Sequence, residues 1–196
     1  MNNMIFENEI TVEVDLSIEE LKKKLKENNF VINEEYDVID VYMVKDEDVN
    51  DTCLEILKKC ILIRNIITKK ENIKRITYKY KEYNEKEEII KQGKINCGID
   101  SIDNAISLFE AIGYKKLIKI NDHLIVYSND NTELVVQLVN NKHIYIEMEE
   151  NCEYIDKKYN DIEEMINDFN KYNIPIKNNN YFVKKAEIEL IESNKV

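Results

Sequence analysis

Two pairs of glutamates in this sequence have a spacing that could bind a metal ion. Glu7 and Glu9 flank one residue in IFENEITVEV, and Glu147 and Glu149 do the same in IEME. Side chains two residues apart on a β-strand share one face at a spacing of about 6.5–7 Å. Two such pairs on neighbouring strands could surround a hard divalent cation, which prefers carboxylate oxygens. Taken alone, each pair is common in a charged protein and typical of a solvated strand edge.

Basic side chains on other strand-like segments indicate phosphate chemistry. Arg64 lies in ILIRN, and Lys79 and Lys81 share a strand face with Thr77 in TYKYK. Carboxylates that hold Mg²⁺ beside arginine and lysine are what polyphosphate chemistry requires, because the metal and the cations neutralise charge while water is activated. The two acidic pairs and these cations together are stronger evidence than either acidic pair alone.

The elements that carry these residues must be strands with two different faces. In the predicted strand 5–14, Ile10, Val12 and Val14 alternate with polar residues, a pattern typical of a strand with one apolar face. This patterning alone favours an ordinary sheet with its charged face in water. The alternative is a barrel of about eight strands, which has room inside for side chains or one small ligand.

Composition predicts a single domain over residues 1–196. The formal net charge of −11 argues against a general nucleic-acid binder, because neutralising phosphates needs an excess of basic residues. It leaves open a small anionic ligand in a local basic pocket. The four cysteines and two histidines show no metal-ligand spacing, so we interpret His123 and His143 as structural. The absence of a secretory signal and of an apolar run of ~20 residues predicts a cytoplasmic protein with reduced cysteines and no membrane contact.

Hydrophobic periodicity predicts an α+β fold dominated by antiparallel hairpins. Ser17 and Glu20 form a capping-box pattern at the start of the first helix. The predicted helices are 17–28, 101–112 and 159–172, and the predicted strands are 5–14, 30–44, 60–67, 74–81, 89–97, 117–120, 124–128, 133–139 and 143–150. Residues 45–58 are expected to be a loop with a short helical turn, and 181–192 a strand-like or helical piece.

The order of short motifs along nearly the whole chain resembles the CYTH family, also called triphosphate tunnel metalloenzymes. That family opens with ExExK, continues through D-x-Y, L-R-I-R and T-x-K strands and a Gly-aromatic pair, and closes with L-D-x-V before a second ExE. The matching segments here, in order, are Glu7–Thr11, Asp40–Tyr42, Ile61–Arg64, Thr77–Lys79, Gly113–Tyr114, Tyr127, Val136–Val139 and Glu147–Glu149. The resemblance implies an eight-stranded antiparallel β-barrel, or tunnel, with helices packed outside and polar residues inside.

The resemblance also implies Mg²⁺- or Mn²⁺-dependent hydrolysis of an inorganic or organic triphosphate. In the class IV adenylate cyclase branch of the family it implies conversion of ATP to cyclic AMP. The implied metal ligands are Glu7, Glu9, Glu147 and Glu149, and the implied phosphate-binding residues are Arg64, Lys79, Lys81 and Lys94. Of these, Glu7, Glu9, Arg64 and Lys79 would act in catalysis.

The sequence departs from the family pattern at several charged positions. Neutral or acidic residues stand at five of the family's basic positions, namely Thr11, Leu62, Gln92, Asp122 and Leu124, while Lys94 replaces an acidic residue and Gln137 the aspartate of L-D-x-V. Threonine, leucine and glutamine cannot reproduce the bidentate phosphate bonds of an arginine fork. Lys94, Lys119 or a shifted register could restore some of the lost charge. Gln137 is expected to weaken one metal site.

The retained glutamates and the missing basic residues together lead to two hypotheses. The first is a divergent triphosphate hydrolase or nucleotidyl cyclase that acts on a small-molecule triphosphate or polyphosphate, with a homodimer as an open option. The second is a catalytically silent protein that keeps the tunnel fold and binds an anionic ligand, because a fold does not fix a function.

Overall fold

The computed structural model describes residues 5–6, 8–83 and 89–193, and the side chains of 8–80 and 93–193. The chain forms two compact units. Unit 1 comprises Met1–Phe6, Asp37–Asn121 and Lys184–Val196, and unit 2 comprises Glu7–Tyr36 and Asp122–Val183. The predicted single domain over 1–196 stays a prediction.

The strands form one sheet, and every pairing with a described register is antiparallel. They are β1 (Ile5–Phe6), β2 (Glu9–Glu13), β3 (Val31–Lys45), β4 (Ile61–Ile67), β5 (Asn72–Tyr83), β6 (Ile89–Gly98), β7 (Tyr114–Ser128), β8 (Glu133–Val139) and β9 (His143–Glu149). Their order in the sheet is β1-β6-β5-β4-β3-β7-β8-β9-β2. The long strands β3 and β7 each continue from one unit into the other.

The antiparallel α+β fold is confirmed, with three adjustments. The predicted strand 5–14 is interrupted, and its two pieces are β1 and β2. The two predicted strands 117–120 and 124–128 are one continuous strand, β7. If β1 and β2 are counted as one strand, the sheet has the eight strands that were predicted. Among the described residues the pairings run as a series from β1 to β2 rather than as a closed ring. The described sheet is therefore open.

The helices largely follow their predicted positions. They are α1 (Ile18–Glu27), α2 (Cys53–Lys59), α3 (Ile102–Ala111), α4 (Ile162–Asn170) and α5 (Lys185–Glu192), with short 3₁₀ turns η1 (Asp46–Asp48) and η2 (Lys177–Asn179). The capping box of α1 is present: the Ser17 hydroxyl accepts from the Glu20 N–H, and the Glu20 carboxylate accepts from the Ser17 N–H at 2.9 Å. The C-terminal piece is helical.

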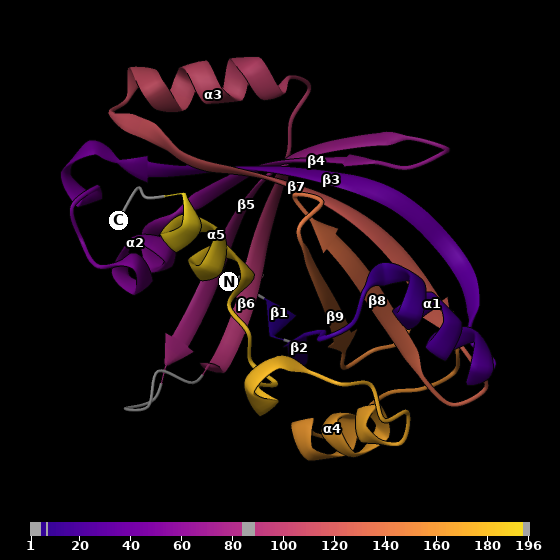
Figure 1. Cartoon of the computed structure of the whole chain (residues 1–196). Helices are drawn as coiled ribbons and strands as arrows, with labels where there is room; N and C mark the ends of the chain where they lie inside the picture. Colours follow the sequence, from indigo (N-terminus) through magenta and orange to yellow (C-terminus); the bar gives the residue numbers. More distant parts are fainter. Residues whose placement is uncertain (1–4, 7, 84–88, 194–196) are drawn as a thin grey trace. The chain divides into compact units, whose positions relative to one another are not determined.

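The hydrophobic core of unit 2 lies on the apolar face of its strands. Alternate residues of β2, β7, β8 and β9 pack with apolar residues of α1 and α4 (Figure 1). The strand members of this core include Ile10, Val12, Ile125, Val136 and Ile146, each at most 5% exposed. Because side chains alternate along a strand, the residues between them lie on the opposite face, and these include the three described ExE glutamates, Glu9, Glu147 and Glu149.

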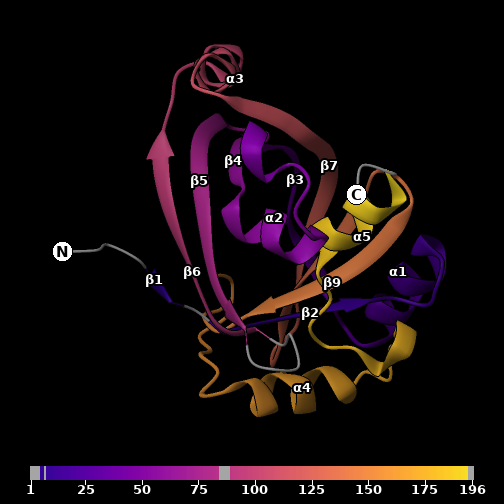
Figure 2. The ribbon, with the colours of Figure 1, turned by 90° about the vertical axis from the view of Figure 1, so that its left-hand side faces the viewer.

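Unit 1 packs helices on both faces of its strands. α3 covers the face that carries Val41, Ile63 and Ile76. α2 contacts β5 and lies side by side with α5, as Figure 2 shows. Alternation places Asp40, Arg64, Arg75, Lys79 and Lys94 on the face away from α3.

Candidate metal and anion sites

Three glutamates of unit 2 form a candidate metal site. One carboxylate oxygen from each of Glu9, Glu147 and Glu149 lies within 4.8 Å of the others. The register explains the cluster, because Glu9 pairs with Glu149 and Thr11 pairs with Glu147 across β2 and β9. Oxygens at such separations suit one divalent cation, whose ligands lie about 2.0–2.6 Å from the ion. The predicted ligand Glu7 lies outside the described residues.

Two polar neighbours orient the carboxylates of this cluster. Thr11 Oγ1 donates to Glu9 Oε1 at 3.2 Å, and Gln137 Nε2 donates to Glu147 Oε2 at 3.0 Å. Gln137 is only 2% exposed. Each bond uses one lone pair of a carboxylate and limits its rotation. Where the resembling family has a carboxylate at position 137, this chain has an amide that donates to a ligand instead of contributing a charge.

The Thr11 position is enclosed by backbone from the far end of the chain. The Thr11 N–H donates to the Tyr181 carbonyl at 3.0 Å, and the Thr11 carbonyl accepts from the Val183 N–H at 2.9 Å. Segment 181–183 thus pairs with the edge of β2 that β9 leaves open. Thr11 is 6% exposed, so this part of the polar face is not a solvated surface. The expectation from patterning alone, a charged face in water, does not hold at Thr11, whereas Glu149 on the same face is exposed.

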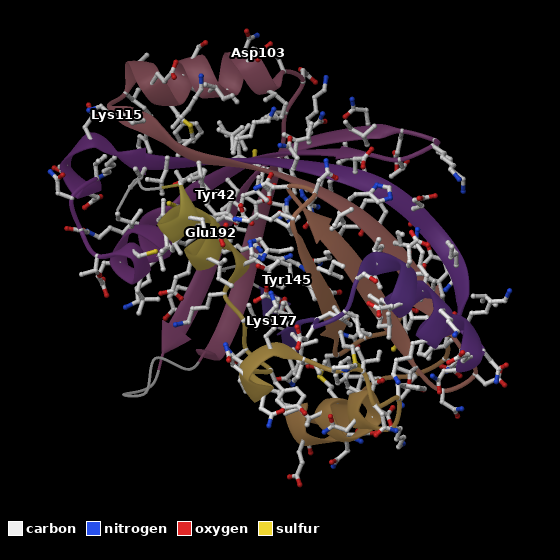
Figure 3. The ribbon with its side chains drawn as sticks, in the orientation of Figure 1. Tyr42, Asp103, Lys115, Tyr145, Lys177 and Glu192 are labelled. Carbon is white, nitrogen blue, oxygen red and sulfur yellow. The ribbon has the colours of Figure 1, made fainter. Side chains whose placement is uncertain are left out.

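A lysine that sequence reasoning missed reaches the same face of β2. Lys177 Nζ donates to Glu13 Oε1 at 2.7 Å, and His143 Nδ1 lies 2.9 Å from the same oxygen. Burial would by itself raise the pKa of Glu13, but these two partners lower it below its ordinary value. Figure 3 marks Lys177 beside Tyr145, the residue of β9 opposite Glu13. No local signal could reveal Lys177, because it lies 164 residues beyond Glu13.

The histidines and cysteines of the structure do not belong to the metal cluster. His143 is bound to Glu13, and His123 Nε2 lies 3.1 Å from Glu35 Oε1. All four cysteines are free. Among the described residues, Glu9, Glu147 and Glu149 are the group able to hold a metal ion.

In unit 1 the predicted phosphate-binding Arg64 is held by a carboxylate. Arg64 Nε donates to Asp40 Oδ1 at 2.7 Å, and Nη2 donates to Asp40 Oδ2 at 2.6 Å. The two side chains are 19% and 10% exposed. Burial would raise the pKa of Asp40, but the bonds to Arg64 and the nearby charges of Lys79 and Lys185 lower it. A bidentate pair of this kind sets the plane of the guanidinium.

The predicted lysines lie on the neighbouring strands. Lys79 on β5 is directly opposite Lys94 on β6, and both are half-buried. Two register positions away, on the same face, Thr77 Oγ1 donates to Asn96 Oδ1 at 2.9 Å. The side chains of Lys81 and Gln92 lie outside the described set, although their backbones pair with each other.

Arg75 is a further cation on this face that sequence reasoning missed. It shares the alternation of Thr77 and Lys79, and it lies directly opposite Arg64. The two-residue period from 75 to 79 was the signal that could have identified it. The described polar face is therefore cationic in unit 1, whereas that of unit 2 gathers carboxylates. The first suits phosphate oxygens and the second suits a divalent cation.

Comparisons with known proteins identify the fold rather than a particular relative. No known family profile matches the sequence, and no curated protein matches it. The solved structure of the PH1819 protein from Pyrococcus horikoshii is similar, with a TM-score of 0.66, 17% identity, and coverage of 94% of this chain and 99% of that one. The PH1012 protein of the same organism matches with a TM-score of 0.61 and 17% identity over 92% and 98% of the two chains.

A third solved structure carries a functional name. A candidate adenylate cyclase from Vibrio parahaemolyticus matches with a TM-score of 0.59 and 13% identity, covering 94% of this chain and 98% of that one. At these identities the similarity establishes a shared fold. The chain therefore has the fold of these proteins over nearly its full length.

None of the helices in the described part of the chain is long and apolar enough to cross a bilayer.

Proposed function

We propose that this protein is a divergent CYTH-like enzyme that hydrolyses an inorganic or organic triphosphate with Mg²⁺ or Mn²⁺. The observation that carries the proposal is the cluster of Glu9, Glu147 and Glu149, because it brings together the two ExE motifs on which the resemblance rests. The fold shared with a candidate adenylate cyclase supports the same family.

The residues divide into two roles. Glu9, Glu147 and Glu149 would hold the divalent cation, and Glu7 would join them by the resemblance. Arg64, Lys79 and Lys94 would bind phosphate oxygens, with Lys81 carried over in the same role. When bound, the cation would polarise a phosphoryl oxygen and lower the pKa of water for attack. Asp40 would keep the guanidinium of Arg64 in a fixed plane before the triphosphate binds.

Two alternatives are each favoured by one observation. The name of the Vibrio parahaemolyticus protein favours conversion of ATP to cyclic AMP. The amide of Gln137, bound to Glu147 where the family has a carboxylate, favours a catalytically silent protein that binds an anionic ligand. Both alternatives keep the anion-binding role of the unit 1 cations and differ in the chemistry that follows.

The test is turnover of defined triphosphates. Phosphate release from tripolyphosphate, thiamine triphosphate and ATP is measured with Mg²⁺ or Mn²⁺, together with formation of cyclic AMP. Glu147→Gln and Glu149→Gln should each reduce turnover at least about a hundredfold, since they remove metal-binding charge. Glu163→Gln is the matched control, because Glu163 is an exposed residue of α4 outside the cluster.

The outcomes distinguish a triphosphate hydrolase, an adenylate cyclase and a catalytically silent binding protein. Phosphate release that needs the metal and is lost in both cluster variants supports the hydrolase. Cyclic AMP from ATP supports the cyclase. Metal-dependent binding of tripolyphosphate without turnover supports the silent binding protein. A wild-type protein that neither binds nor turns over any of the three triphosphates would refute the proposal.

A further inference from the structure

We propose that Arg75 is a phosphate-binding residue, and that Arg64 and Arg75 together replace the arginine pair that Leu62 removes from β4. The inference rests on the proposed function, because it assigns a further residue to the same anion site. The resembling family places two arginines on one strand, at the positions of Leu62 and Arg64. Here the second arginine would come from the neighbouring strand.

The register places the two guanidinium groups together. Arg64 of β4 is the direct cross-strand partner of Arg75 of β5. The adjacent pair, Ile63 and Ile76, lies on the face covered by α3, so Arg64 and Arg75 both lie on the other face. The Cβ atoms of direct partners are about 4.5–5.5 Å apart, whereas residues two apart on one strand are about 6.5–7 Å apart. The cross-strand pair is thus at least as compact as the pair it would replace.

The packing of unit 1 explains why the arginine is not at position 62. Leu62 is 2% exposed, and its cross-strand partner Thr77 is 1% exposed. A guanidinium at position 62 would have to be desolvated almost completely, which is costly without a matched partner. Arg75 lies two register positions away, on the same face, and is half-buried, so it keeps contact with water. In this chain the second arginine therefore stands at the half-buried position 75 instead of the buried position 62.

The charges on this face favour a multivalent anion. On the described strands β3–β6 of unit 1, one carboxylate, Asp40, shares this face with Arg64, Arg75, Lys79 and Lys94. Helix α5, whose Lys185 lies close enough to Asp40 to lower its pKa, adds that lysine and the carboxylates Glu187, Glu189 and Glu192 to unit 1. Asp40 accepts from Nε and Nη2 of Arg64, which turns the rest of that guanidinium away from the carboxylate. Like charges directly opposite each other on a sheet are destabilising. An anion that binds both guanidinium groups would offset that repulsion.

The experiment measures binding of inorganic tripolyphosphate to the full chain by calorimetry, in the presence of Mg²⁺. Arg75→Gln and Arg64→Gln should each weaken binding about tenfold or more, because hydrogen bonds to charged groups are strong. Arg75→Lys should fall between wild type and Arg75→Gln, since lysine keeps the charge and loses the bidentate fork. Lys69→Gln is the matched control: it removes one charge from the turn that joins β4 and β5, where Lys69 is exposed, and should change binding less than about twofold.

Each result either supports or overturns the role of Arg75 in phosphate binding. If wild type binds and Arg64→Gln is weakened while Arg75→Gln behaves like Lys69→Gln, the role of Arg75 is overturned and the proposed function stands. If wild type does not bind tripolyphosphate, the proposed function fails and the inference fails with it. Circular dichroism checks that each variant folds. If Arg75→Gln does not fold, Arg75→Lys decides, and wild-type affinity in that variant overturns the inference.

Discussion

Asp40→Asn is the sharpest test of how the cationic face is held in place. Asparagine keeps one acceptor oxygen, so the variant loses one of the two charge-assisted bonds to Arg64, at 2.7 and 2.6 Å, and the negative charge. A hydrogen bond to a charged group contributes about 1.5–3 kcal/mol, and breaking a fully buried ion pair costs about 3–5 kcal/mol. The Arg64 side chain is 19% exposed and can recover some hydration. We therefore expect a loss of about 2–3 kcal/mol in the free energy of unfolding.

Urea unfolding at neutral pH measures this loss. A double-mutant cycle with Arg64→Gln should give a coupling energy of about 1–2 kcal/mol, since the two residues share both bonds. Asp46→Asn is the control: Asp46 pairs with Lys115 at 3.3 Å, but the two side chains are 52% and 62% exposed. That exposed pair should contribute less than about 1 kcal/mol. A cost for Asp40→Asn no larger than that of Asp46→Asn, or purely additive effects with Arg64→Gln, would refute the reasoning.

The same variant has a defined pH dependence. The pKa of Asp40 is lowered in the folded protein, so its contribution to stability is fully present above the pKa of the unfolded chain, about 3.9. It is lost as the pH falls through the lower folded pKa. The stability difference between wild type and Asp40→Asn should therefore be constant from pH 7 to 5 and shrink below about pH 4.

Three further variants test other contacts. Gln137→Glu should tighten Mn²⁺ binding about tenfold, because it places a carboxylate where an amide now donates to Glu147 at 3.0 Å; unchanged metal affinity in calorimetry would contradict this. Lys177→Met should raise the pKa of Glu13 toward its ordinary value and cost about 1 kcal/mol of stability at pH 7 in urea, and no change would show that the ion pair is dispensable. Asp168→Asn should cost about 3 kcal/mol, since Asp168 is 4% exposed and binds two lysines; a thermal unfolding curve equal to that of wild type would disprove it.

Local patterns in the sequence were sufficient to predict the main helices and strands and to place two of the three glutamates of the metal cluster on one face. The alternation in 5–14 predicted a two-faced strand, and Ser17 with Glu20 predicted where α1 begins, because strand faces and helix caps depend on neighbours within a few residues. The ExE spacing predicted that Glu147 and Glu149 share a face for the same reason. The break in the predicted strand at Asn8 was not predicted, because β1 and β2 pair with different strands, β6 and β9.

Other features were decided only by the tertiary structure. The sequence alone could not show that Gln137 donates to Glu147, that Lys177 reaches Glu13, or that Asp40 binds Arg64 through both oxygens. Each of these contacts joins different elements, and its existence depends on strand register and on where a distant segment packs. By itself, the sequence determined which residue types lie on each strand face. The folded chain decided which of them meet, because a shift of one residue in register would turn every side chain of a strand to the opposite face.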